Sequence, residues 1–348
     1  MKKKIDVIIP VWNSGQYIGS FIDGMLSQTY QDFHMYFVYD SSKDNTLSII
    51  RSYQCGNEGR ITILYSEKRC GQGAARDLVM DRMQLQGDYV IFLDADDYPE
   101  KNFLEKMVET AERYQVDLVM CGFNCFEDET GKIISTQMVD NTDAVISDLT
   151  HYVDIAYMNP AVWNKLYRRE VAEKVRFGKV KSMEDGLYIA KILPYVRSIK
   201  IINEVLYHYR VSVASAQARM TADEFEERWS YYTEMAKYYG ENQAVYAGYR
   251  ELFEVMAFVK CAIGLTYRTA LKDMRNLHYY ISYSKKMLND ITPQWKENKS
   301  LQMRYCFQRP MKANAVACCA FLYKINFFSL FIIAYWLYQN LVHKEVRW

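Results

Sequence analysis

The sequence lacks an excess of charge of either sign. Its 43 Lys and Arg residues nearly balance its 42 Asp and Glu residues, which leaves a formal net charge of +1. Such a balance produces no global field that would attract nucleic acid or another polyanion. With 348 residues, of which 50% are hydrophobic and 24% charged, the chain is long enough to bury a full core in one large or two ordinary domains.

The cysteines lack the spacing of a metal site, and a secretory signal is missing as well. Of the 8 cysteines, Cys121 and Cys125 lie close together, Cys318 and Cys319 are adjacent, and the others are scattered. We therefore expect reduced, mostly buried thiols in a cytoplasmic protein. After the basic start, only residues 5–9 precede Pro10, and Asp6 is among them, so the apolar run is too short for a signal peptide.

Residues 1–120 alternate short apolar runs with helical patterns, which indicates βαβ units around a parallel sheet. Apolar spacing predicts strands at 5–9, 35–39, 61–65, 89–93 and 118–121, and helices around 18–26, 47–50, 75–83 and 103–111. Polar side chains follow three of these strands, at Asn13, Asp40 and 94–97. In open α/β sheets ligands bind outside the carboxyl ends of the strands, so these residues predict the site.

The rest of the chain follows other patterns. Residues 124–148 are polar and hairpin-like, 163–173 predict a short helix, and 221–300 are Tyr-rich and helical with few Gly or Pro. In the tail, 327–337 is an almost unbroken apolar run. A spanning helix needs about 20 apolar residues, and Lys324 and Asn326 interrupt any such window. Aromatic residues beside cations favour a helix in the membrane interface, with packing on the chain's own domain or on a dimer partner as the alternative.

Three carboxylates, Asp94, Asp96 and Asp97, lie within four residues directly after an apolar strand. Like charges this close repel one another unless a cation or a hydrogen-bonding ligand offsets them. Mg²⁺ and Mn²⁺ prefer carboxylate oxygens, and Mg²⁺ is usually held by one or two carboxylates together with substrate phosphates. The cluster therefore predicts a metal and diphosphate site. Alternatively, Asp96 and Asp97 cap a helix that begins near Pro99.

Several short segments recur together in one known family. They keep their order and spacing across residues 4–215, at 8–13, 28–30, 38–46, 71–77, 92–97, 163–167, 184–185 and 209–210. In these segments the chain resembles the family 2 glycosyltransferases. The resemblance implies a GT-A fold, an α/β domain with a Rossmann-like mixed sheet flanked by helices, over 1–215. A helical subdomain at 216–305 and apolar, membrane-associated helices at 306–348 are expected to follow.

The resemblance also implies a nucleotide-sugar site, lined by Pro10, Trp12, Asn13, Asp40, Arg76, Asp94, Ala95 and Asp96. Within it, Asp96 would bind Mg²⁺ or Mn²⁺, Asp94 would meet the ribose, and Asp97 would cap the following helix. Asp40 could instead be a turn residue. The family usually has Asp-Asp-Gly-Ser where this chain has Tyr39, Asp40, Ser41 and Ser42, which leaves the choice of base open.

The family's catalytic base position is occupied by Glu184 and Asp185. The resemblance implies that Asp185 removes the acceptor proton and that Glu184 orients it or binds acceptor hydroxyls, although acids at this place also cap helices. Arg76 is expected to face the nucleotide or pyrophosphate, or to pair with Asp77 or Asp94. Trp163 could stack on a sugar or fill the core, and Arg210 could contact phosphate.

Taken together, these features predict an inverting, metal-dependent transfer of a sugar from a UDP-sugar to a saccharide or lipid-linked acceptor. The expected setting is surface-polysaccharide synthesis at the inner face of the cell membrane, without nucleic acid. Two alternatives stay open: a sugar nucleotidyltransferase, although residues 10–16 lack its Gly-rich loop, and a degenerate transferase that serves as a binding or assembly partner. The sequence does not predict the oligomeric state.

Overall fold

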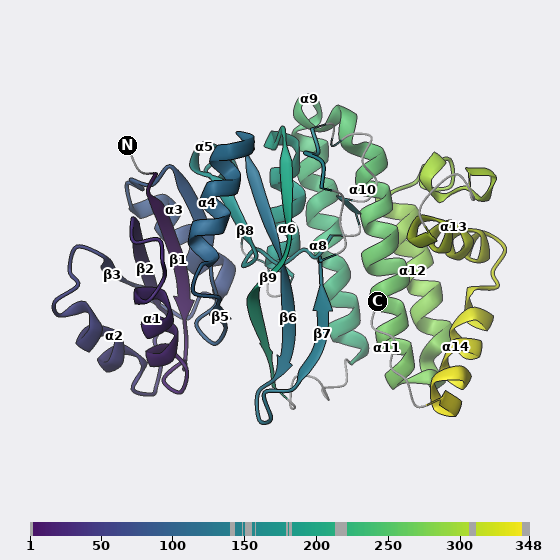
Figure 1. The fold of residues 1–348 in the computed structure, drawn as a ribbon. Coiled ribbons are helices and arrows are strands. Elements are labelled where there is room, and N and C mark those ends of the chain that lie inside the picture. The colour runs from purple at the N-terminus through teal and green to yellow at the C-terminus, as the bar shows by residue number, and fades with distance from the viewer. Residues whose placement is uncertain are drawn as a thin grey trace. The chain divides into compact units, whose positions relative to one another are not determined.

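The structure is a computed structural model that describes residues 3–139, 143–147, 149, 155–156, 158–178, 180, 183–212, 221–305 and 311–342. The chain divides into two compact units, one of residues 1–148 and 160–218 and the other of 149–159 and 219–348. Figure 1 shows that the strands belong to the first unit, whereas the second is helical. The division at 215 and 305 that the sequence suggested stays a prediction.

The first unit is built around one mixed sheet. Its strands are β1 (Ile5–Val11), β2 (Phe33–Tyr39), β3 (Ile61–Tyr65), β4 (Tyr89–Phe92), β5 (Tyr98–Pro99), β6 (Leu118–Glu127), β7 (Ile133–Gln137), β8 (Lys165–Arg168) and β9 (Ile199–Val211). Its helices are α1 (Ile18–Leu26), α2 (Thr46–Gln54), α3 (Gln72–Arg82), α4 (Phe103–Tyr114), α5 (Arg169–Ala172) and α6 (Glu184–Ile192). The strands follow the order β3-β2-β1-β4-β8-β6-β9-β5, and β7 pairs with β6.

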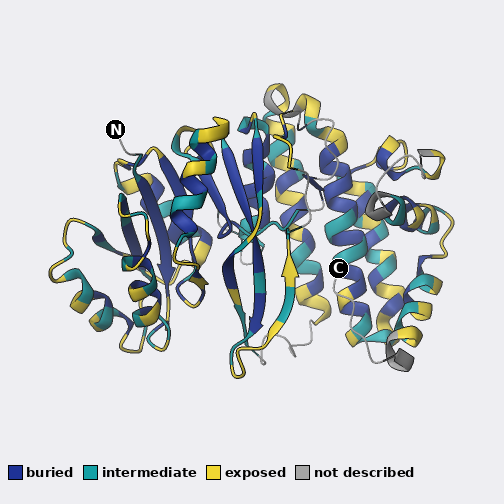
Figure 2. Ribbon diagram, viewed as in Figure 1, coloured by how far each residue is buried: buried dark blue, intermediate teal, exposed yellow. Residues whose placement is uncertain are grey.

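Parallel pairing brings the strand ends together at one edge. Strand β1 pairs in parallel with both β2 and β4, and all seven of its residues are buried. Strands that are covered on both faces have near-continuous apolar sequences, which explains why this one could be predicted from its composition. Figure 2 shows β1 and β4 in the dark blue of buried residues, whereas β7 is largely exposed. The loops that follow β1, β2 and β4 therefore begin at strands that are packed in the core.

The helix predicted over 163–173 was wrong for most of its length. Residues Lys165–Arg168 form β8, which pairs antiparallel with both β4 and β6, and only Arg169–Ala172 is helical. Leu166 and Tyr167 are buried within the sheet. Long-range pairing on both sides thus overrides the local helical pattern. The hairpin-like character of the segment from residue 124 onward is confirmed where β6 and β7 pair antiparallel.

The second unit consists of helices. They are α8 (Ala222–Glu241), α9 (Gln243–Tyr246), α10 (Arg250–Ala257), α11 (Thr266–Lys272), α12 (Leu277–Ile291), α13 (Met311–Lys324) and α14 (Phe328–Val342), and a π-helix (Phe258–Leu265) joins α10 to α11. A capping box of Thr221 and Glu224 begins α8. Helix α14 buries Phe328 and Ile332 and contacts α11 and α12. Across the described residues, no helix combines the length and apolarity needed to cross a membrane.

Candidate active site

The loop after β1 is fastened to the loop after β2. Asn13 adopts a left-handed conformation, with a φ of 49°, and its backbone N–H donates to Ser42 Oγ at 2.9 Å. The N–H of Lys43 in turn donates to Asn13 Oδ1 at 3.0 Å. Asn tolerates this backbone conformation better than most residues. Asn13 therefore shapes the two loops beside the predicted nucleotide pocket.

Asp40 is buried at the end of β2 and holds a third loop. Its carboxylate accepts hydrogen bonds from the backbone N–H groups of Cys70, at 3.0 and 3.1 Å, and Gly71, at 3.1 Å. Asp40 therefore does not serve as a turn residue before α2. The carboxylate that accepts the backbone N–H at the start of α2 is that of Asp44, which binds Thr46. Asp40 instead positions the loop that enters α3.

A flat aromatic surface lies at the same end of the site. Trp12 is 44% exposed, and the guanidinium carbon of Arg69 lies 3.6 Å from the centre of its ring. Pro10, by contrast, is buried within β1 and aligned with Val38 of β2. Trp12 and Arg69 are thus accessible to a planar ligand, whereas Pro10 supports the loop from below.

The three carboxylates after β4 have different surroundings. Asp97 accepts from the Tyr207 hydroxyl at 2.9 Å and from the backbone N–H of Arg210 at 2.7 Å. It therefore binds β9 and does not cap a helix, since Asn102 occupies the N-cap of α4. Asp96 is exposed, and in the described chain its carboxylate has no hydrogen-bond donor beyond its own backbone; partial desolvation by its surroundings raises its pKa. Ala95, between Asp94 and Asp96, is buried.

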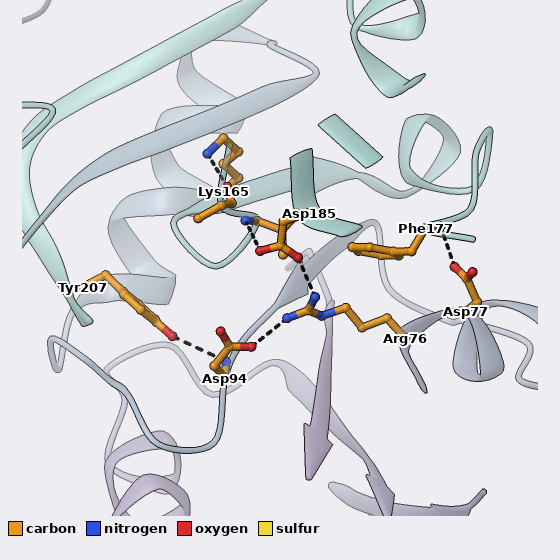
Figure 3. A network of polar contacts seen from close by, with 9 residues as sticks. Arg76, Asp77, Asp94, Lys165, Phe177, Asp185 and Tyr207 are labelled. Carbon is orange, nitrogen blue, oxygen red and sulfur yellow. Dashed lines mark hydrogen bonds and ion pairs between the residues drawn. The ribbon is translucent and has the colours of Figure 1, made fainter. Parts of the chain in front are cut away.

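Arg76 joins Asp94 to the start of α6. The guanidinium is fully buried, with Nη2 at 2.6 Å from Asp94 Oδ1 and Nη1 at 2.6 Å from Asp185 Oδ1 (Figure 3). Burial opposes its charge, but Asp185 and Asp94 outweigh that effect and raise the pKa of Arg76. Burial also raises the pKa of Asp94, to about 7, against the opposing effect of Arg76. Arg76 therefore pairs with Asp94 as one alternative predicted, but not with Asp77, and it does not reach the surface.

The carboxylates of α6 lie close to α3. Asp185 Oδ2 accepts a hydrogen bond from the N–H of Val162 at 3.3 Å, while Oδ1 binds Arg76. A Cβ atom on Gly73 would lie 3.0 Å from Glu184 Cβ, so glycine at this position permits the close approach of the two helices. No side-chain capping bond is formed at the start of α6. Glu184 and Asp185 nevertheless lie in the first turn of α6, where the helix dipole favours acids as the helix-capping alternative expects, and Asp185 also binds Arg76.

Asp77 and Phe177 enclose Arg76 from one side. The Asp77 carboxylate accepts from the backbone N–H groups of Phe177 and Gly178, both at 2.9 Å. This holds the Phe177 ring with its centre 5.2 Å from the Arg76 guanidinium carbon (Figure 3). The ring covers the fully buried guanidinium, whereas the Asp94 and Asp185 side chains stay 12% and 22% exposed. Burial of the cation strengthens its interaction with the two carboxylates.

A second arginine supports the loop of Asp96. Arg210 Nε donates to the carbonyl oxygen of Asp96 at 2.5 Å, and Nη1 lies 2.7 Å from Asp128 Oδ1. The Tyr17 hydroxyl donates to the same Asp128 carboxylate, and the Tyr17 ring lies 4.5 Å from the guanidinium. Arg210 is thus oriented by three groups next to the carboxylate cluster.

Trp163 belongs to the core. It is 4% exposed and contacts Phe123, Tyr207 and Tyr209 through its rings. A sugar has no access to a ring buried this far, so the core interpretation describes the structure and the sugar-stacking one does not. Tyr209, its neighbour in the stack, is exposed.

The residues of the site fit a divalent cation only together with a substrate. No group of three or more His, Cys, Asp and Glu side chains in the described chain could hold a metal ion alone. The open carboxylate of Asp96 provides one oxygen donor, and Mg²⁺ commonly completes its shell with water and substrate phosphates. The donor set therefore suits a cation that arrives with a diphosphate.

Comparison with known proteins identifies the family. The profile described as glycosyl transferase family 2 matches residues 6–176. An uncharacterized glycosyltransferase of Nostoc, alr2836, is 30% identical over 71% of this chain and 77% of its own length. The chain belongs to the family 2 glycosyltransferases. This membership decides against the nucleotidyltransferase alternative.

Two further proteins resemble this glycosyltransferase, one in part of its sequence and one in its structure. The putative teichuronic acid biosynthesis glycosyltransferase TuaG of Bacillus subtilis is 37% identical over 31% of this chain and 42% of its own length. A crystal structure of S. aureus TarS residues 1–349 in complex with UDP-GlcNAc aligns with a TM-score of 0.69 and 18% identity. That alignment covers 95% of this chain and 91% of the TarS chain. The match confirms the GT-A fold expected for the glycosyltransferase.

Several residues of the glycosyltransferase site were not predicted. Arg69 lies one position before the Asp40-bound loop, and Asp128 lies 82 residues from its partner Arg210. No local pattern indicates either contact, because both depend on how distant strands pair. The pairing of Asp185 with Arg76, 109 residues apart, likewise needed the folded chain.

Proposed function

We propose that the protein is an inverting glycosyltransferase that moves a sugar from a UDP-sugar to a saccharide or lipid-linked saccharide acceptor. One observation carries the proposal: Arg76 holds Asp94, at the end of β4, and Asp185, at the start of α6, in a single buried ion-pair chain. A diphosphate bound beside Asp94 and Asp96 would thus lie close to a fixed carboxylate that can accept a proton.

Asp185 is the proposed catalytic base. Its Oδ1 is engaged by Arg76, whereas within the described part of the chain Oδ2 accepts a single 3.3 Å hydrogen bond, from the Val162 N–H, so we take Oδ2 as the oxygen that meets an acceptor hydroxyl. As that hydroxyl oxygen bonds to the anomeric carbon, its proton passes to Oδ2 and the bond from carbon to the diphosphate oxygen breaks on the opposite side. A single displacement inverts the anomeric configuration. A positioned base typically contributes about 10² to 10⁴ in rate.

The remaining residues have supporting roles in this proposal. Arg76 keeps Asp185 oriented, Glu184 binds acceptor hydroxyls, and Asp94 meets the ribose. Asp96 would hold Mg²⁺ or Mn²⁺, which when bound offsets the charge that develops on the leaving diphosphate. Arg210 has its Nε on the carbonyl of Asp96, so it supports that loop and lies next to the expected diphosphate.

The nucleotide base would bind at Trp12 and Arg69, with Asn13 and Asp40 shaping the loops. A UDP-sugar is supported by the fold shared with TarS, which was crystallised with UDP-GlcNAc. Synthesis of a surface polysaccharide is supported by TuaG, whose name assigns it to teichuronic acid biosynthesis. The donor sugar is to be found by experiment, because it depends on a few contacts in the pocket.

A donor screen tests the proposed activity. Purified full-length protein with Mn²⁺ is incubated with UDP-glucose, UDP-galactose and their N-acetyl forms, with GDP- and dTDP-sugars for comparison, and nucleotide release is measured. We expect release of UDP from one or two UDP-sugars, and loss of that release with EDTA. Tight UDP binding by calorimetry without release from any donor would instead support the degenerate, binding-only alternative.

We also propose that the protein binds the inner face of the cell membrane through α13 and α14. Both helices and the turn between them carry exposed apolar side chains, of which Leu330, at 56% exposure, is the most open: they are Phe321, Ile325, Phe327, Leu330, Ile333, Leu337 and Tyr338. Because Phe328 and Ile332 face the protein, packing on the chain's own domain accounts for only one side of α14. Lys296 lies close enough to Lys285 and to Lys324 to lower the pKa values of both, after the larger effect of burial.

Vesicle sedimentation tests this contact. The full chain should sediment with vesicles that contain anionic phosphatidylglycerol, and Leu330→Glu with Leu337→Glu should release it while UDP binding stays unchanged. Ile133→Glu, at an equally exposed apolar position on β7, is the control and should not release it. Equal sedimentation of both variants would contradict the membrane proposal, and a change of oligomeric state in the α14 variant would favour a dimer interface.

A further inference from the structure

A group of three nearly parallel aromatic rings ends at the surface of the first unit. Trp163 stacks on Tyr207, with ring centres 4.7 Å apart and planes 12° apart, and on Tyr209, at 5.2 Å and 9°. Tyr207 is fully buried and Trp163 nearly so, whereas Tyr209 is 37% exposed. Stacking on Trp163 and Tyr207 therefore fixes the plane of the Tyr209 ring. Because the ring is already ordered, it loses little further conformational entropy when a ligand binds.

The inner rings are attached to the carboxylates of the site. The hydroxyl of Tyr207 donates to Asp97, and it points toward the Asp94 backbone in Figure 3. Val162, next to Trp163, donates its N–H to Asp185. Partial burial, followed by the negative charges of Asp97, Asp94 and Asp96, raises the pKa of Tyr209. The exposed tyrosine is thus a neutral, oriented ring within electrostatic reach of the carboxylate cluster.

The position of Tyr209 in the sheet distinguishes between donor and acceptor. Trp12 and Asp40 follow β1 and β2, on one side of β4 in the strand order, whereas β9, which carries Tyr209, lies on the other side beyond β8 and β6. In an in-line displacement the acceptor approaches opposite the leaving group. A ring on the side away from the nucleotide therefore suits the acceptor.

We propose that Tyr209 is the platform on which a pyranose ring of the saccharide acceptor stacks, which makes it a residue that determines acceptor binding. Pyranose rings present C–H groups that pack on an aromatic face, while their hydroxyls remain free to meet nearby carboxylates. This inference rests on the proposed function and adds to it the chemistry of the acceptor subsite.

The test compares four variants in the UDP-release assay with Mn²⁺. Octyl β-glycopyranosides of glucose, galactose and their N-acetyl forms serve as acceptors, and the glycoside that most accelerates the wild-type enzyme is used for kinetics. Tyr209→Ala should raise KM for this glycoside about tenfold. It should leave the UDP dissociation constant and the UDP release without glycoside unchanged. Tyr209→Phe and Tyr209→Trp, which keep a ring, should stay within about twofold of wild type.

Tyr114→Ala, at a similarly exposed tyrosine on α4, is the matched control and should change none of these values. An unchanged glycoside KM in Tyr209→Ala would overturn the proposal, and so would an equal loss of release with and without glycoside, because that would place the ring at the donor. A wild-type enzyme that releases UDP but is stimulated by no pyranoside would also overturn it. Absence of release from every donor would instead be the failure of the proposed function itself.

Discussion

The two ends of the site are held together by different means. At the catalytic end, a buried arginine binds two carboxylates at 2.6 Å each beneath the Phe177 ring. At the nucleotide end, Asp40 and Asn13 bind mainly backbone N–H groups, and the flat surface of Trp12 and Arg69 is open to solvent. Charged pairs around a buried cation fix one geometry, whereas exposed rings can adapt to different ligands. On the proposed function, we infer that the reaction takes place at the rigid end and that the donor is selected at the adaptable one.

The largest effect is expected from removing the positive charge of Arg76, which holds the rigid end together. Arg76→Met leaves Asp94 and Asp185 close together without their cation, and breaking a buried pair in this way costs about 3–5 kcal/mol of unfolding free energy. We expect sugar transfer to be lost and the urea midpoint to fall. Lys106→Met, which breaks the surface pair with Glu204, is the control and should cost about 0–1 kcal/mol. Equal losses of unfolding free energy in Arg76→Met and Lys106→Met would contradict the view that the catalytic end is held by a buried ion pair.

A smaller but still large effect is expected at Asp96. Asp96→Asn should reduce Mn²⁺-dependent UDP release about 10²-fold, whereas Asp81→Asn, at an exposed carboxylate on α3, should not. Partial desolvation raises the pKa of Asp96 above its ordinary value of 3.8, and a cation binds only the deprotonated form. As the pH falls, Mn²⁺-dependent UDP binding in the wild type should therefore begin to weaken at a higher pH than an ordinary aspartate would cause, as measured by calorimetry. The same pH dependence in Asp96→Asn would assign the proton to another group.

The smallest effect is expected at the adaptable end. Trp12→Ala should weaken UDP binding by about three- to tenfold and leave the rate at saturating donor nearly unchanged, because the ring contributes binding and no chemistry. Trp12→Tyr, which keeps a flat aromatic ring, should restore most of the affinity. Arg69→Gln should alter the ratio of UDP to GDP affinity, since it changes the partner of the Trp12 ring. A collapse of the saturated rate in Trp12→Ala would contradict the separation of roles.

The strands that carry the site could be predicted because their apolar runs are continuous and their order in the chain is regular. Residues at the strand ends, such as Asn13, Asp40 and Asp96, followed from that prediction. The partners of these residues could not be predicted, since Cys70 reaches Asp40 only after β2 and α3 are in place. The strand β8 was missed for a related reason, as its sequence is stabilised by neighbours that lie far away in the chain.

The central claim is that Asp185, fixed by Arg76, removes the acceptor proton. It is tested most directly by the transfer rate of Asp185→Asn at saturating donor and acceptor, measured beside the UDP dissociation constant. The asparagine keeps the shape of the side chain but cannot take up the proton. We predict a fall in rate of about 10² to 10⁴ with unchanged UDP binding. A rate within about threefold of wild type would contradict the assignment.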